Sequence, residues 1–521
     1  MRYDVVVVGS GFGGAVAACR LAAAGRSVLV LERGRRWEPE DYPRRPGDAW
    51  LFDPRAPHRR NGWLELRFLD QMVVAQGAGV GGGSLIYANV CIDARPEAFD
   101  SGWPSAITAR EMAPYYRDVA EMLTPMEIPA GQHTARLELM RRAADAIGEP
   151  ERFQKVPLAI RFDPGFTHAP AETPEYERSV AAPNAQGREQ GTCVHCGSCD
   201  VGCPTRAKNT LDLNYLAAAE DSGAVIAPLS LARYLSREDG GWRVHFDHLD
   251  GGRRRPDSVT ARRVILAAGS LGSTELLLRS RDEHQTLGDL PRALGRGWSS
   301  NGDFLTPAGY GRMSVAPTSG PTITSAIDFL DGSRGGRYFV EDGGIPNLLR
   351  NCFEQRLRDG VGSPLRRRMW LRLSRAGAFD SVMPWFGQSV DAADGSVYLG
   401  RGRVRPWRRV VKLDWNPHRS ETVIGAMAEM HGLLTEATGG KPNPLLTWKR
   451  FRALVTPHPL GGCNMAASPA AGVVDHACRV FGQDGLYVMD GAVIPRAIGR
   501  NPSKTIAAVA ERAVALLLAE D

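Results

Sequence analysis

The sequence lacks the long uninterrupted apolar runs that a membrane span or a secretory signal needs. Near the N-terminus, glycines interrupt the apolar segment from Val5 to Cys19, which follows the charged Asp4 and is too short to cross a bilayer. Cysteine is also scarce, with 9 residues in 521, and four of these lie within residues 193–203. This distribution is typical of a reducing compartment rather than of a disulfide framework. We therefore expect a cytoplasmic protein without structural disulfides.

A strong excess of charge of either sign is missing as well. The chain has 64 basic and 58 acidic residues, which gives a formal net charge of +6. This small surplus favours solubility and indicates no nucleic-acid partner. Hydrophobic residues make up 43% of the chain, enough for a large buried core, and the length fits two or three domains. We expect a compact globular protein, and charge alone selects no partner for it.

The first 32 residues follow the order strand, glycine turn, helix and strand. Four valines fill residues 5–8, an alanine-rich stretch covers residues 14–24, and a second apolar run covers residues 27–31. The turn Gly9-Ser-Gly11-Phe12-Gly-Gly14 lets backbone approach a pyrophosphate at the helix N-terminus. Glu32 ends the second strand, where its carboxylate can accept hydrogen bonds from ribose hydroxyls. The motif predicts dinucleotide binding without separating FAD from NAD.

A second glycine-rich block covers residues 77–89 and includes Gly79, Gly81, Ser84, Tyr87 and Asn89. Backbone with so few Cβ atoms suits a wrap around a flat ring and its pyrophosphate. A mobile linker is the alternative interpretation.

The C-terminal segment predicts an apolar-faced helix over residues 503–518, with Asn501 as its cap and Pro502 at its first position. The positive end of such a helix can stabilise an anionic reduced flavin. A purely structural cap is the alternative.

A histidine lies between proline and glycines in His458-Pro-Leu-Gly-Gly-Cys463. Imidazole, with an ordinary pKa of about 6.5, can take a proton from a hydroxyl while hydride leaves the carbon. Taken alone, such a histidine is more often structural.

These motifs, together with residues 266–275 and Asp490-Gly491, resemble the glucose-methanol-choline (GMC) oxidoreductases, and among them most closely the cholesterol oxidases. The resemblance runs from end to end and is loosest over residues 311–450. It implies a non-covalent FAD and the oxidation of an alcohol. The cofactor-binding residues that it implies are Gly9, Gly11, Phe12, Gly14, Glu32, Gly79, Gly81, Ser84, Tyr87, Asn89, Asp490, Gly491, Asn501 and Ser503.

The resemblance also implies that His458 and Asn501 lie at the substrate hydroxyl. There His458 would position and deprotonate the alcohol, and Asn501 would hold the same oxygen or polarise the flavin as hydride moves to N5. Cholesterol oxidases also use a glutamate to move a proton from C4 to C6 of the steroid, and Glu341 matches that position. Burial beside an apolar ring is expected to raise the pKa of this carboxyl. A solvent-facing Glu341 is the alternative, and the adjacent Asp342 is a rival. A sterol 3β-hydroxyl is the expected substrate, with oxygen or a redox partner as the electron acceptor.

The implied fold class is α/β, in which a discontinuous Rossmann-like FAD-binding domain is joined to an α+β substrate domain built on an antiparallel sheet. We assign residues 1–100, 205–310 and 455–521 to the first domain and residues 101–204 and 311–454 to the second. Apolar runs at residues 225–227, 264–268 and 485–491 predict further strands of the first domain, and stretches such as 396–399 and 409–415 predict strands of the second.

Cys193, Cys196, Cys199 and Cys203, followed by Pro204, have the spacing of the iron–sulfur runs of bacterial ferredoxins. Structural zinc and free thiols are the alternatives. An iron–sulfur cluster would favour a dehydrogenase of another alcohol or of a sugar, which passes electrons onward. Separately, residues 366–375 mix arginines with tryptophan and leucines, which indicates either weak contact with a membrane surface or a solvated basic face.

Overall fold

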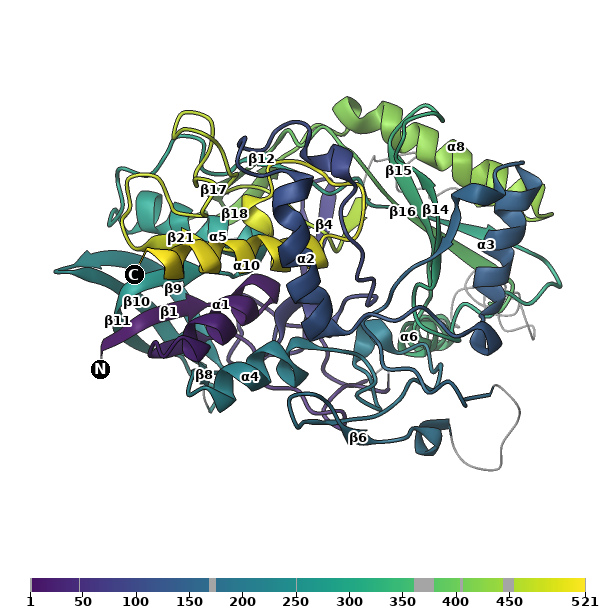
Figure 1. Cartoon of the computed structure of the whole chain (residues 1–521), viewed down its shortest axis with the longest axis horizontal. Coiled ribbons are helices and arrows are strands. Elements are labelled where there is room, and N and C mark those ends of the chain that lie inside the picture. Colours follow the sequence, from purple (N-terminus) through teal and green to yellow (C-terminus); the bar gives the residue numbers. More distant parts are fainter. Residues whose placement is uncertain are drawn as a thin grey trace.

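The computed structural model describes residues 2–45, 47–167, 175–249, 251–359, 379–402, 406–443 and 454–520. Two large β-sheets lie at opposite ends of the molecule, with helices packed on each (Figure 1). In the described residues, no helix is long and apolar enough to cross a membrane.

The first large sheet has seven strands and brings together segments from three distant parts of the chain. Five strands form its parallel part, in which β2, β1, β11 and β21 pair in turn and β8 flanks β2; β10 and β9 continue it as an antiparallel ribbon. Val5 to Val8 are buried because strands on both sides and helices enclose this central strand. The strands are β1 (Arg2–Val8), β2 (Val28–Leu31), β8 (Val225–Ala227), β9 (Ser230–Glu238), β10 (Gly241–His248), β11 (Arg255–Leu266) and β21 (Leu486–Val488).

Helices pack against this sheet and against one another. The C-terminal α10 lies alongside α1, and α1 also contacts α4 (Figure 1). α2 packs on α10 and leads toward the other end of the molecule. The bounds of these helices are α1 (Phe12–Ala23), α2 (Ala109–Leu123), α4 (Tyr215–Asp221), α5 (Gly269–Leu278) and α10 (Ser503–Ala519).

The second large sheet is antiparallel and has six strands in the order β19, β13, β16, β15, β14, β5. Helices α3 (Ala135–Ala146) and α8 (Glu421–Ala437) contact each other and cover its outer face (Figure 1). The strands are β5 (Phe153–Lys155), β13 (Phe304–Gly309), β14 (Ser325–Phe329), β15 (Tyr338–Asp342), β16 (Val382–Ser389) and β19 (Lys441–Pro442).

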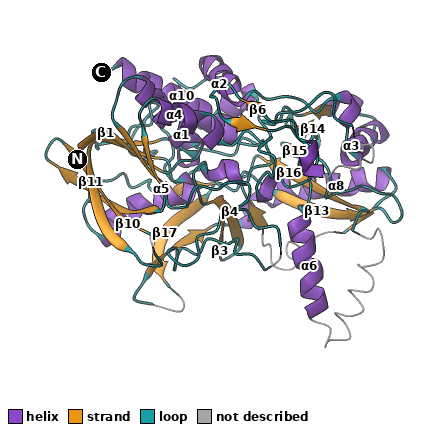
Figure 2. Ribbon diagram, turned by 90° about the horizontal axis from the view of Figure 1, so that it is seen from below, coloured by secondary structure: helices purple, strands orange, loops and turns teal. Residues whose placement is uncertain are grey.

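Smaller sheets lie between the two large ones. β3, β4 and β20 form one, β12, β17 and β18 form another, and β6 and β7 pair separately. β3, β17 and α6 (Asn347–Asp359) lie along one edge of the molecule in Figure 2. The strands are β3 (Leu64–Leu69), β4 (Met72–Gly77), β6 (Ala182–Pro183), β7 (Glu189–Gln190), β12 (Arg296–Trp298), β17 (Gly395–Arg401), β18 (Arg409–Asp414) and β20 (Leu454–Thr456).

The predicted α/β fold class is confirmed, and the structure refines two details. The antiparallel sheet already includes Phe304, ahead of the predicted boundary at residue 311. β17 and β18 exist as expected, but they form a separate sheet with β12, and β17 contacts α5 beside the first large sheet. The division into domains stays a prediction.

Candidate active site

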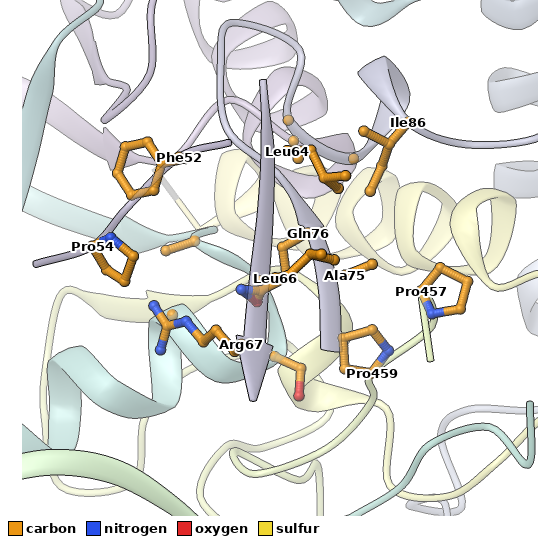
Figure 3. Close-up of a pocket in the computed structure, with 18 of the residues that line it drawn as sticks. Phe52, Pro54, Leu64, Leu66, Arg67, Ala75, Gln76, Ile86, Pro457 and Pro459 are labelled. Atoms are coloured by element: carbon orange, nitrogen blue, oxygen red, sulfur yellow. The ribbon is translucent and has the colours of Figure 1, made fainter. Parts of the chain in front are cut away.

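A cavity of about 2120 Å³ extends between the glycine turns at the N-terminus and the segments that carry His458 and Asn501. Most pockets for single small molecules have volumes of roughly 300–1,000 Å³. This cavity is therefore large enough for a dinucleotide and a second large molecule. Leu64, Leu66 and Gln76 of the β3–β4 hairpin line one wall (Figure 3). Pro457 and Pro459, the neighbours of His458 in the chain, line the same cavity (Figure 3).

The first glycine turn depends on the absence of side chains. Gly9 has a φ of +100°, and a Cβ there would lie 2.4 Å from the carbonyl oxygen of Ala267. A Cβ on Gly14 would lie 2.1 Å from the Gly9 carbonyl oxygen, so this glycine lets α1 pack closely on the turn. Gly11 and Phe12, where α1 begins, line the cavity. The turn thus presents backbone and a helix N-terminus to the cavity, as a pyrophosphate requires.

Glu32 lies at the cavity wall directly after β2, and its carboxylate is held from two sides. One carboxylate oxygen accepts hydrogen bonds from the Ser10 amide (3.1 Å) and hydroxyl (2.7 Å), and the other accepts from the Gly34 amide (2.9 Å). Burial raises the pKa of this carboxyl. The position is the one where a ribose-binding carboxylate is expected in this fold.

The second glycine block touches the first. A Cβ on Gly82 would lie 2.6 Å from the Gly11 Cα, and both Gly82 and Gly83 line the cavity. Three of the predicted residues, Gly79, Gly81 and Ser84, lie behind this wall. Gly79 packs on Trp37, and the Ser84 hydroxyl donates a hydrogen bond to the carbonyl of Gly81 (2.7 Å). These three therefore support the loop rather than face the cavity.

Tyr87 and Asn89 follow in the same block. The Tyr87 ring lines the cavity, and its hydroxyl donates a hydrogen bond to the carbonyl of Asn209 (2.7 Å). Asn89 is fully buried with a φ of +68°, and both polar atoms of its side-chain amide lack a hydrogen-bond partner among the described residues. Buried amides without partners are rare. The unpaired amide and the glycine cradle fit a bound dinucleotide.

Asp490, Gly491 and Ser503 complete this side of the cavity. Asp490 accepts hydrogen bonds from the Gly269 amide (2.9 Å), the Ser273 hydroxyl (2.5 Å) and the Ala492 amide (2.7 Å). Burial raises the pKa of Asp490 to about 6. Its carboxylate thereby joins the start of α5 to the segment that precedes α10.

His458 lies at the cavity wall just after β20. Its Nδ1 is 2.9 Å from Oδ1 of the fully buried Asp303. A carboxylate only accepts hydrogen bonds, so Nδ1 carries the proton and Nε2 is the basic nitrogen of the neutral ring. Burial lowers the pKa of His458, but the negative charge and the hydrogen bond of Asp303, with the charge of Glu341, outweigh burial and raise it.

Asn501 also lines the cavity, but it does not cap α10 as predicted. Pro502 is the cap residue, and no side chain caps this helix. Instead, the Asn501 side-chain amide donates a hydrogen bond to Glu341 at 3.5 Å, and its Oδ1 has no partner among the described residues. The side chain is thus left to interact with a ligand.

Glu341 on β15 is fully buried and lies behind Asn501 rather than on the cavity wall. Its Oε2 accepts a hydrogen bond from the Gln388 side-chain amide at 2.7 Å, whereas Oε1 has no partner among the described residues. Burial raises the pKa of Glu341 to about 7. A solvent-facing glutamate, the alternative considered from the sequence, does not agree with this position.

The adjacent Asp342 has a different environment. Its carboxylate accepts hydrogen bonds from the amides of Thr324 and Ser325, both at 2.7 Å, and lies 3.6 Å from the buried guanidinium of Arg136. These contacts join β15, β14 and α3. Asp342 therefore has structural partners and no contact with Asn501.

Comparison with known proteins identifies the family of this chain. GMC oxidoreductase family models match residues 176–290 and 392–510, and an NAD(P)-binding Rossmann-like model matches residues 7–37. A cholesterol oxidase of Mycobacterium tuberculosis is 32% identical over 99% of this chain and 91% of its own length. The chain belongs to the GMC oxidoreductase family.

One further relative and one solved structure extend the comparison. A cholesterol oxidase of Acinetobacter baumannii is 29% identical over 99% of this chain and 95% of its own length. The crystal structure of pyridoxine 4-oxidase from Mesorbium loti matches with a TM-score of 0.64 and 18% identity over 99% of both chains, which shows a shared fold. The chain described here is thus an FAD-dependent alcohol oxidoreductase of the GMC family that acts on a small-molecule alcohol.

The cysteine segment of this GMC protein does not form a recognisable metal site. Cys193 is buried and Cys196, Cys199 and Cys203 are half-buried. Burial raises the thiol pKa of the first three. Among the described residues, no group of three or more Cys, His, Asp or Glu side chains is arranged to hold a metal ion. The segment that predicted a membrane contact, residues 366–375, lies outside the described residues.

Two residues of the site have no counterpart among the sequence predictions. Asp303, which holds His458, is 155 residues away from it in the chain, and Gln388, which holds Glu341, is 47 residues away. The only signal for Asp303 is the polar run Ser299-Ser-Asn-Gly-Asp303 just before an apolar strand.

Proposed function

We propose that this enzyme oxidises the 3β-hydroxyl of a sterol to the ketone, and that Glu341 then moves a proton within the steroid. The observation that carries the proposal is the buried Glu341 carboxyl beside Asn501, with a pKa raised by burial to about 7. Simple alcohol oxidation does not need such a group, whereas a proton shuttle near neutral pH does. The names of the two cholesterol oxidase relatives support the same substrate class.

The mouth of the cavity also supports an apolar substrate. Seven large hydrophobic side chains are exposed to solvent and line the cavity: Leu51, Phe68, Leu305, Leu349, Trp407, Val410 and Val455. Phe68 and Trp407 are 77% and 78% exposed. Phe68 belongs to β3 and Leu349 to α6, two elements on the lower side of Figure 2, and Trp407 lies in the turn before β18. Exposed apolar clusters of this kind mark contacts with other molecules, and a sterol-rich surface fits this one.

Basic side chains accompany these apolar residues. Arg55, Arg60, Arg233, Arg408, Arg409 and Lys412 also line the cavity. Apolar side chains among cations favour weak contact with an anionic lipid surface. The proposal therefore includes delivery of the sterol from such a surface. The mouth of the cavity would make this contact, whereas residues 366–375, for which a contact was predicted, lie outside the described residues.

In the proposed oxidation, FAD supplies the hydride acceptor when bound. His458 uses Nε2 to take the hydroxyl proton, and the hydrogen bond from Nδ1 to Asp303 keeps the ring in the orientation and tautomer that this transfer requires. The second amide hydrogen of Asn501 is available to hold the hydroxyl oxygen. The two side chains thus orient the alcohol and remove its proton.

In the proposed isomerisation, the Glu341 carboxylate takes a proton from C4 and returns one to C6, so the carboxylate is regenerated and the double bond moves into conjugation with the ketone. Because Glu341 lies behind Asn501, its free Oε1 has to reach the cavity past that side chain. With a pKa of about 7, both protonation states of Glu341 are populated near neutral pH.

The proposal is tested by mixing the oxidised holoenzyme without oxygen with cholesterol or a short 3β-hydroxysteroid. Flavin bleaching is followed together with the absorbance of the conjugated enone, and a 3α-hydroxy epimer serves as the matched control. Bleaching with enone for the 3β compound alone supports both steps. Bleaching without enone removes the isomerisation, and no bleaching with any sterol removes the steroid substrate.

A second candidate, an iron–sulfur-linked dehydrogenase of another alcohol or of a sugar, rests on the spacing of the four cysteines at residues 193–203. Iron analysis of the purified protein and oxygen consumption during turnover separate the two candidates. Stoichiometric iron with no oxygen uptake favours the dehydrogenase. Iron-free protein that consumes oxygen favours the oxidase.

A further inference from the structure

One buried turn, Ser299–Asp303, contacts both segments that carry the proposed catalytic groups. Its side chains at Ser299, Ser300, Asn301 and Asp303 are fully buried. Buried polar side chains cost free energy unless they are hydrogen-bonded. Four of them in one turn therefore indicate a specific set of hydrogen-bond partners.

The first contact of the turn reaches His458. Asp303 accepts hydrogen bonds from His458 Nδ1 at 2.9 Å and, through its other oxygen, from the Thr456 hydroxyl at 2.6 Å. The Thr456 hydroxyl in turn accepts a hydrogen bond from the backbone amide of His458 at 2.9 Å. Both the ring and the backbone of His458 are therefore tied to the same carboxylate.

The second contact reaches the segment before Asn501. The Asn301 side-chain amide donates a hydrogen bond to the carbonyl of Arg500 at 2.8 Å, and its oxygen accepts hydrogen bonds from the amides of Ile498 (3.0 Å) and Gly499 (3.1 Å). Asn301 has a φ of +55°, a left-handed conformation that asparagine adopts more readily than most residues. One side chain thus fixes the backbone that leads directly to Asn501.

The turn itself is anchored from the antiparallel sheet. Asp391, just beyond β16, accepts hydrogen bonds from the hydroxyls of Ser299 (2.7 Å) and Ser300 (2.9 Å) and from the Ser300 amide (2.9 Å). The turn is therefore a rigid link between that sheet and the two cavity-facing segments.

We propose that the Ser299–Asp303 turn is the element that positions both catalytic groups, with Asp303 setting the tautomer and orientation of His458 and Asn301 setting the place of Asn501. This inference rests on the proposed role of His458 as the base, but not on the identity of the alcohol. Asp303 and Asn301 are positioning residues because neither lines the cavity.

The tautomer is tested in the holoenzyme without substrate, by nitrogen NMR of histidine labelled with ¹⁵N, in the wild type and in Asp303→Asn. The His458 signal is assigned by its loss in His458→Gln. In the wild type we expect a proton on Nδ1 of His458. In Asp303→Asn the amide can donate to Nδ1, which favours the proton on Nε2. His431, a buried histidine that contacts Thr306, serves as the internal control in the same spectrum.

The same variant is then examined with the best alcohol found. The charged groups that face His458 are Asp303 and Glu341. Loss of the Asp303 charge lowers the pKa of His458, so the acid limb of the flavin-reduction profile moves to lower pH. We expect the maximal rate to fall about 10²–10⁴-fold because the wrong tautomer cannot accept the proton, with KM changed only a few-fold.

Asn301→Gly separates the two roles of the turn, because glycine keeps the backbone conformation and removes the amide. We expect a slower maximal rate with an unchanged pH profile and an unchanged His458 tautomer. An Asp303→Asn protein that binds FAD and keeps both the wild-type tautomer and the wild-type pH profile would overturn the proposal. If Asp303→Asn fails to fold, Thr456→Val is measured instead. It removes the hydroxyl that donates to Asp303 and accepts from the His458 amide, and it keeps the Asp303 charge. An unchanged maximal rate in that variant overturns the proposal. Failure of the sterol assay alone removes only the proposed substrate.

Discussion

The wall of the cavity at the glycine turns, here called the cofactor wall, and the wall at His458 differ in which atoms form them. The cofactor wall consists largely of backbone from two glycine turns, which meet where a Cβ on Gly82 would lie 2.6 Å from Gly11. The wall at His458 consists of side chains that distant segments bring together, with Asp303 and Glu341 behind them. Local sequence specifies the first wall, whereas tertiary packing creates the second. Substitutions in the two walls should therefore fail in different ways.

The largest expected effect is on the side-chain wall. His458→Gln removes the proposed base and should slow flavin reduction by the alcohol about 10³–10⁴-fold, because a glutamine amide cannot take the hydroxyl proton that Nε2 of His458 accepts in the proposal. FAD content, measured by the ratio of flavin to protein absorbance, should stay unchanged. His431→Gln is the matched control, since His431 is also buried but lies outside the cavity. If His458→Gln lost FAD and activity to the same extent, the proposed difference between the two walls would be contradicted.

In the cofactor wall, a substitution is expected to weaken FAD binding. Gly9→Ala should lose most of its FAD, at least a tenfold loss of affinity or about 1.4 kcal/mol, because the new Cβ would lie 2.4 Å from the Ala267 carbonyl oxygen. Gly25→Ala is the control, since Gly25 also has a positive φ, +76°, but has nothing within 4 Å of its Cβ position. Retained yellow colour in Gly25→Ala and its loss in Gly9→Ala would confirm the cradle. Full FAD binding by both would contradict it.

Glu341→Gln tests whether oxidation and isomerisation depend on different side chains at the wall that contains His458. Flavin reduction should stay within about tenfold of the wild type, while formation of the conjugated enone should fall about 10²–10⁴-fold, because the proton shuttle is lost. Product analysis by absorbance and chromatography measures both rates. Asp342→Asn serves as the comparison, because its contacts are structural and it should reduce stability without changing the product. An unchanged enone rate in Glu341→Gln would remove Glu341 from the mechanism.

The smallest expected effect is on stability as a function of pH. Burial raises the folded-state pKa of Glu341 to about 7, above its ordinary value of 4.5, so the folded protein binds the proton more tightly than the unfolded chain. Stability from this group is therefore lost as the pH rises from about 4.5 to about 7, by at most about 3 kcal/mol. Glu341→Gln should melt like the wild type near pH 5 and at a higher temperature at pH 8. A difference in melting temperature that is constant with pH would contradict the raised pKa.

The contrast between the walls also explains what could be predicted from the sequence. The first glycine turn, Glu32 and the last helix are local patterns, and each was found at or near its predicted bounds. The role of Asn501 as a helix cap was wrong, because its side chain makes its contact with Glu341 instead. Local sequence favours asparagine at a helix start whatever its side chain then contacts.

The remaining parts of the site depend on contacts between segments far apart in the chain. Asp303 belongs to no motif, and its role appears only when β20 is placed beside the turn before β13. Gln388 likewise faces Glu341 only because β15 pairs with β16. The ferredoxin-like spacing of the four cysteines left an iron–sulfur cluster, structural zinc and free thiols as alternatives, because spacing alone does not place four sulfurs around one point.

The most direct test of the proposed chemistry is a single-turnover reaction of the oxidised holoenzyme without oxygen, using a 3β-hydroxysteroid with hydrogen or deuterium at C3. We predict bleaching of the flavin that is slower with deuterium, because the hydride leaves C3, and no bleaching with the 3α epimer. Absence of bleaching with every 3β-hydroxysteroid, in protein that carries FAD, would contradict the account of this site as a sterol oxidase.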